Sequence, residues 1–66
     1  MEKERMLKWF AFDHFPAELQ TYSKPFHNTA MFIVANVEPG PERTVALRKL
    51  LESKDAAVRA VVHPGG

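Results

Sequence analysis

The longest hydrophobic pattern in the chain covers residues 16–37 and has the period of an α-helix. Its apolar side chains recur at steps of three or four residues, which places them on one helix face: Leu19, Tyr22, Phe26, Ala30, Ile33 and Val37. Pro16 suits the first helical position, since its missing N–H would have no partner there. Because the apolar phase continues past Pro25, we expect one helix over 16–37 that is kinked at Pro25.

Residues 31–34, with the sequence MFIV, leave an alternative open. Their composition also suits a β-strand, but their neighbours keep the helical phase, which favours a helix. This part of the helix is apolar nearly all round, a pattern typical of burial on two sides. One side can face a second helix, and the other side then needs another subunit.

A second helix is predicted over residues 41–63, after a turn at residues 38–40. Pro41 stands at its start, and the sequence Pro-Gly-Gly ends it. Lys54 interrupts its apolar stripe, which otherwise consists of Leu47, Leu50, Leu51, Val58, Val61 and Val62. The two patterns together predict an all-α fold, an antiparallel helical hairpin.

The N-terminal part of the chain divides into two pieces. Residues 1–8 carry mixed charges, and we expect them to be frayed. Residues 9–15 read WFAFDHF and place four aromatic side chains within seven residues. This aromatic arm is either strand-like or a short helix, and it must pack against an apolar surface.

Composition adds a reason for self-association. A chain of 66 residues forms one domain, here 1–66, and such a short chain buries only roughly 60% of its surface. It has no cysteine for a disulfide or a thiolate metal site, and its three histidines lack metal-ligand spacing. Because 45% of the residues are hydrophobic, we expect the chain to form a homo-oligomer.

Charge and motifs argue against several classes of function. Nine basic and eight acidic residues give a net charge of +1, which is too balanced for a binder of DNA or RNA polymers. No apolar run is long enough to span a membrane, and the N-terminus has no hydrophobic region typical of a signal peptide. There is no recognisable catalytic set. We therefore expect a cytosolic protein that is not an enzyme and has no cofactor or metal.

Three features could bind a ligand, although each has an ordinary structural alternative. Arg43 lies at the start of a helix, where free N–H groups attract anions, but it could be a solvated surface residue. Lys24 and His27 share a helix face, with Thr29 further round, and this face could simply be solvated. Phe12 could stack on a nucleobase or close a small core.

Two stretches of the sequence, FDHFPAELQTYSKPFHNTA and GPERTVALRKLLESKDAAVRA, resemble a family of small phage proteins. These proteins defeat CBASS immunity by sequestering cyclic-oligonucleotide signals, and they share a helical hairpin with phage sponges directed against Thoeris immunity. The resemblance covers residues 10–62, and the second stretch is its most specific part. It implies a homohexamer in the cytoplasm of a bacterial host.

The resemblance also implies two kinds of pocket. Cyclic dinucleotides would be held between protomers by a stacking aromatic, which falls on Phe12, and a basic partner, which falls on His27 with Lys24 as a substitute. Cyclic trinucleotides would be held by a ring of arginines, here Arg43, with Thr29 near the phosphates. The family often has tyrosine and lysine where this chain has Phe12 and His27.

The resemblance thus implies a phage immune-evasion protein that binds cyclic di- or trinucleotides without hydrolysing them. The alternative is a small helical adaptor or inhibitor of a host protein. A minimal regulator of nucleic acid is a third reading, and the near-neutral charge counts against it.

Overall fold

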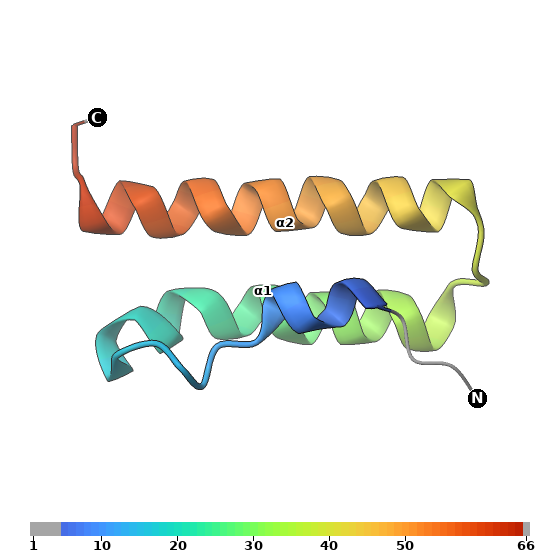
Figure 1. Ribbon diagram of the computed structural model, residues 1–66, viewed down its shortest axis with the longest axis horizontal. Coiled ribbons are helices and arrows are strands. Elements are labelled where there is room, and N and C mark those ends of the chain that lie inside the picture. Colours follow the sequence, from blue (N-terminus) through green and yellow to red (C-terminus); the bar gives the residue numbers. More distant parts are fainter. Residues whose placement is uncertain (1–4, 66) are drawn as a thin grey trace.

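The computed structural model describes residues 5–65, and over this range the chain forms helices in the order η1, α1, α2 (Figure 1). η1 is a 3-10 helix over Arg5–Phe10, α1 spans Ala17–Asn36 and α2 spans Pro41–Val62. No strand occurs between residues 5 and 65. α1 and α2 lie side by side and antiparallel (Figure 1), so the predicted all-α helical hairpin is confirmed.

α1 is one continuous helix that includes Pro25. Residues 31–34 lie inside it, so the strand alternative for MFIV is wrong. Pro16 is the N-cap residue, and its carbonyl accepts the N–H groups of Leu19 and Gln20 at 2.9 and 3.1 Å. The predicted kink at Pro25 stays a prediction.

α2 begins where the sequence predicted it. Gly40 is the N-cap residue and provides no side-chain cap, and Pro41 stands in the first turn. The Gly40 carbonyl accepts the Thr44 N–H at 3.1 Å. α2 ends one residue before the predicted boundary, because His63 is already its C-cap residue.

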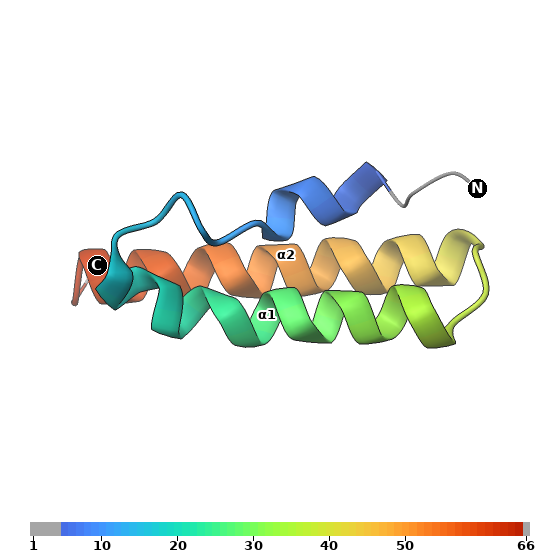
Figure 2. The same cartoon turned by 90° about the horizontal axis from the view of Figure 1, so that it is seen from below.

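The N-terminal arm, defined here as residues 5–16, differs from its prediction. Residues 5–8 are not frayed, since they belong to η1. Within this helix, Met6 and Leu7 pack against the core. Residues 1–4 lie outside the described residues. The aromatic stretch 9–15 is neither a strand nor one helix, since η1 ends at Phe10 and an irregular segment follows. Figure 2 shows η1 on one side of the hairpin, with the rest of the arm running back to the start of α1.

Each helix contributes one fully buried apolar residue to the core, namely Phe10, Ala30 and Leu47. Around them pack the partly buried side chains Met6, Leu7, Phe26, Ile33, Val34, Leu50 and Leu51. The predicted face of α1 is therefore correct at Phe26, Ala30 and Ile33. It is wrong at Tyr22, which is exposed, because Ser23 takes the buried position at this level.

Much apolar surface stays uncovered in the single chain. Phe32 on α1 is 65% exposed and Trp9 in η1 is 56% exposed. Tyr22, Met31, Val37, Val61 and Val62 are exposed as well. Within residues 5–65, neither long helix combines the length and the hydrophobicity that a bilayer span requires. The packing of one chain thus leaves the second side of the apolar segment 31–34 open, as the sequence predicted.

Candidate functional site

Phe12 and His27 form an aromatic pair between the arm and α1. Their ring centroids are 5.1 Å apart and their planes meet at 67°, a T-shaped arrangement. Such pairs contribute about 0.5–1.5 kcal/mol beyond the area they bury. A turn positions Phe12, since its carbonyl accepts the Phe15 N–H at 3.1 Å. Both rings are partly buried, so each keeps some surface that a ligand can reach.

His27 also presents an unsatisfied polar atom at this pair. Its Nδ1 is buried and has no hydrogen-bond partner among residues 5–65. The same is true of the Oγ of Ser23, one helical turn earlier on α1. Leaving such an atom buried and unpaired costs about 1–3 kcal/mol. Because these atoms are buried, a ligand can reach them only if the arm or the His27 ring moves.

Lys24 lies on the same flank of α1 as His27. The two residues are three positions apart, which separates them by only about 60° around the helix axis. Lys24 is exposed, so its ammonium can move toward an anion bound beside the aromatic pair. Lys24 and His27 therefore share one flank of α1, and their role in binding a ligand stays a prediction.

Thr29 does not join this group within one chain. It is exposed, and two residues beyond His27 it is rotated by about 200° around the helix axis. Thr29 consequently lies on the far flank of α1 from the arm. If Thr29 lies near a phosphate, as predicted, that phosphate must bind in a different pocket from the one beside Phe12 and His27.

Arg43 faces the end of α1. It is partly buried, and its Nη1 donates to the carbonyl of Val37 at 3.0 Å and to that of Val34 at 3.4 Å. The sequence analysis did not predict these bonds. Arg43 is neither a solvated surface residue nor confined to the start of α2, because it also contacts the end of α1. A cation is favoured here by the negative end of the α1 dipole. Its predicted contact with phosphates stays a prediction.

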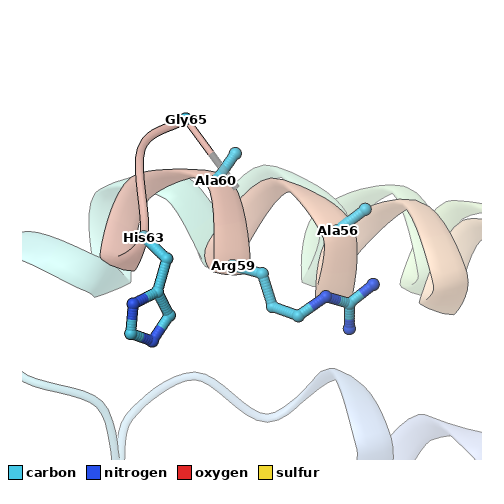
Figure 3. Close-up of a pocket in the computed structure, with 5 residues that line it drawn as sticks. All are labelled: Ala56, Arg59, Ala60, His63 and Gly65. Carbon is cyan, nitrogen blue, oxygen red and sulfur yellow. The ribbon is translucent and has the colours of Figure 1, made fainter.

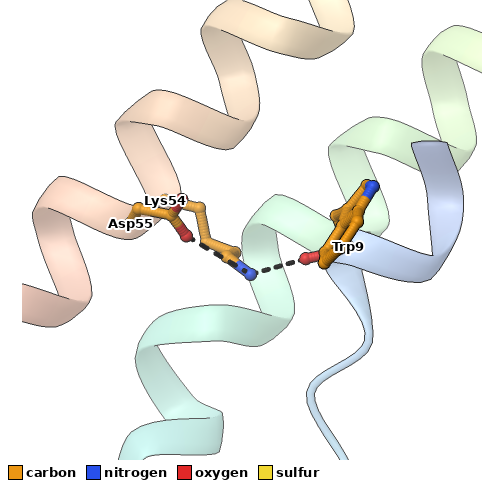
Figure 4. Close-up of polar contacts among 3 residues, drawn as sticks. All are labelled: Trp9, Lys54 and Asp55. Carbon is orange, nitrogen blue, oxygen red and sulfur yellow. Dashed lines mark hydrogen bonds and ion pairs between the residues drawn. The ribbon is translucent and has the colours of Figure 1, made fainter.

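Lys54 is a buried cation whose place on the apolar stripe the sequence did not explain. It is only 6% exposed, and its Nζ donates to the carbonyl of Trp9 at 2.6 Å (Figure 4). The same Nζ lies 3.7 Å from a carboxylate oxygen of Asp55. It also lies 5.9 and 5.8 Å from the ring centroids of Phe10 and Phe15, within cation–π range. In the sequence, Lys54 was recognisable only as a cation that interrupts the apolar stripe of the second helix.

A hollow of about 420 Å³ lies at the C-terminal end of α2, lined by Ala56, Arg59, Ala60, His63 and Gly65. Arg59 and His63 point to the same side of α2 in Figure 3. The helix dipole favours cations at this end, which suits Arg59 in the last turn of α2. None of the residues predicted to bind a ligand lines this hollow.

Within the described part of the chain, no group of three or more His, Cys, Asp or Glu side chains gathers as a metal site would require. Comparisons with protein-family models, curated proteins and solved structures find no match to the chain. The candidate site consists of Phe12, His27 and Lys24.

Proposed function

We propose that the protein binds cyclic di- or trinucleotides and sequesters them without hydrolysis. By its resemblance to the phage sponges, it would do so as a homohexamer in the cytoplasm of a bacterial host. Signalling nucleotides held in this way cannot activate the effectors of CBASS immunity. The family, the hexamer and the cellular setting in this proposal rest on the resemblance.

The observation that carries the proposal is the Phe12–His27 pair, which brings a ring that can stack and a basic side chain together. A nucleobase can stack on the phenyl ring of Phe12 beside His27. The ammonium of Lys24 can then neutralise a phosphate. Aromatic stacking on a base is worth about 1–3 kcal/mol, and a charged hydrogen bond adds a comparable amount.

Assembly supports the same proposal. The protomer exposes Phe32 and other large apolar side chains, and a second copy can cover them. A ligand pocket formed between copies is already ordered when the ligand arrives, which lowers the ordering cost of binding. In an assembly, Thr29 and Arg43 of several protomers could line the predicted trinucleotide pocket, which is separate from the pocket of Phe12.

The test is isothermal titration of cyclic di- and trinucleotides into the protein and into Phe12→Ala. We expect Phe12→Ala to weaken cyclic dinucleotide binding by about tenfold to a hundredfold, since it removes the stacking surface. His14→Ala is the matched control, because His14 is an exposed ring on the same arm. Equal affinities for the protein and Phe12→Ala would refute the site, and recovery of linear nucleotide would refute sequestration.

The adaptor reading is kept as a second candidate because of one observation, the 65% exposure of Phe32 on α1. A helix face of this kind can also pack against a partner protein. This candidate predicts no heat in any of the nucleotide titrations, so the same experiment separates the two functions.

A further inference from the structure

Phe12 lies between two points at which side chains of the hairpin hold the backbone of the arm. On one side, three residues before Phe12, the carbonyl of Trp9 accepts the Lys54 bond from α2 at 2.6 Å. On the other side, the carbonyl of Phe15 accepts a bond from the Gln20 Nε2 of α1 at 2.8 Å. The position of the Phe12 ring therefore depends on both anchors.

The Lys54 anchor is the more elaborate of the two. Trp9, which accepts the bond, is 45 residues away from Lys54 in the sequence. The bond therefore connects the arm to α2. The aromatic rings of Phe10 and Phe15 flank the same ammonium, and Asp55 supplies a partial counter-charge. A buried ammonium needs such compensation, and every group named except Asp55 belongs to the arm.

We propose that Lys54 is a positioning residue that holds Phe12 against His27. By binding the end of η1, it fixes the point from which the irregular segment of the arm starts. The consequence for ligand binding rests on the function proposed above: Lys54 would keep the stacking surface ready before the nucleotide arrives. Affinity falls in proportion to the fraction of molecules in which the arm is docked.

The first experiment does not need a ligand. With ring centroids 5.1 Å apart, the ring of Phe12 should shift the NMR signals of the His27 ring protons, which are assigned by their loss in His27→Asn. We expect Lys54→Met to move these signals toward their positions in Phe12→Ala by at least half of the difference. Lys49→Met is the matched control, since Lys49 is an exposed lysine of the same helix, and it should leave the signals in place.

Two results would overturn the proposal. One is a folded Lys54→Met whose His27 signals stay at their original positions, even if its thermal midpoint falls. The other comes from the unaltered protein and does not depend on whether the variant folds. If no side-chain proton of Lys54 shows a nuclear Overhauser effect to Trp9, Phe10 or Phe15, the anchor does not exist in solution.

Nucleotide titrations then separate this proposal from the proposed function. We expect Lys54→Met to weaken cyclic dinucleotide binding about tenfold, as it would if a tenth of the arms stayed docked. In a Phe12→Ala background the same substitution should weaken binding no further, because the side chain it positions is gone. If the unaltered protein binds no cyclic nucleotide, the proposed function fails, while the His27 signals still decide the role of Lys54.

Discussion

Arg43 and Lys54 each donate hydrogen bonds to carbonyl groups at the end of another helix. The last carbonyl groups of a helix lack partners within it, and cations are favoured beside them. α1 has no basic residue in its own last turn, and Arg43 of α2 donates to its terminal carbonyls instead. Lys54 does the same for η1 through Trp9. Of these two cations, only Lys54 joins parts of the chain that are distant in sequence, because Arg43 lies six and nine residues from its partners.

At Arg43 we predict a loss of stability on substitution. Arg43→Met removes the charged hydrogen bonds to the end of α1 and should lower the free energy of unfolding by about 1–2 kcal/mol. Urea unfolding followed by circular dichroism measures this change. Arg48→Met is the control, as Arg48 is exposed on the same helix and should change the value by less than about 0.5 kcal/mol. Equal stabilities of the two variants would contradict the capping role.

At Ser23 we predict that substitution increases the stability of the fold. Its hydroxyl is fully buried and unpaired among residues 5–65, so its desolvation is uncompensated in the folded protein. Ser23→Ala should therefore raise the free energy of unfolding by about 1 kcal/mol. Ser53→Ala, at an exposed position of α2, should be nearly neutral. A clear loss of stability in Ser23→Ala would mean that the hydroxyl has a partner in solution.

At the scale of the elements, α1 tolerates a proline in its interior. Pro25 is the ninth residue of the helix, where it lacks the N–H that would continue the hydrogen-bond ladder. The packing of the inner face against η1 and α2 must outweigh this loss. The helix therefore owes its continuity to tertiary contacts rather than to local propensity.

Replacing this proline tests that interpretation. Pro25→Ala restores an N–H donor and should raise the free energy of unfolding by about 1–3 kcal/mol, as measured by urea unfolding. Pro64→Ala, beyond the end of α2, is the control and should change it by less than about 0.5 kcal/mol. A lower stability in Pro25→Ala would show that the proline ring itself contributes to the packing.

The helices were predictable because their apolar residues repeat with a helical period, whereas the arm has no such pattern. η1 could not be predicted, since its stability comes from contacts of Met6 and Leu7 with the rest of the core. The burial of Ser23 in place of Tyr22 could not be predicted for a related reason. The centre of the buried face depends on where the arm packs, and hydrophobicity alone favoured the larger side chain.

The candidate site was predictable only in part. The resemblance assigned Phe12 and His27 to one pocket between protomers, but the pairing of their rings within a single chain was not predicted. The shared face of Lys24 and His27 follows from helical spacing. The bonds of Arg43 and Lys54 depend on which helix end lies opposite each of them. That information is tertiary, so the sequence showed only that both cations stood in unusual places.

At the scale of the whole molecule, the protomer has few fully buried apolar residues and a large exposed apolar surface. Phe32 and Met31 lie on the side of α1 that neither η1 nor α2 covers. Association with further copies is one way in which so small a chain can be stabilised. The proposed function therefore depends on an assembly whose interfaces include this side of α1.

Substitution at this surface tests the assembly. Phe32→Glu places a charge in the middle of the proposed interface and should release single protomers at micromolar concentration, as measured by light scattering after size-exclusion chromatography. Asn28→Glu is the matched control, because Asn28 is exposed one turn earlier on the same side of α1 but is already polar. An assembly that persists in Phe32→Glu would exclude this side of α1 as an interface.

The most direct test of the account is sedimentation velocity of the protein mixed with cyclic di- or trinucleotides, recorded at the absorbance bands of both tryptophan and nucleotide. We predict a single boundary that contains several copies of the chain and carries the nucleotide with it. The nucleotide recovered from that boundary should still be cyclic. A folded single protomer that sediments without any nucleotide would contradict both the assembly and the sequestration.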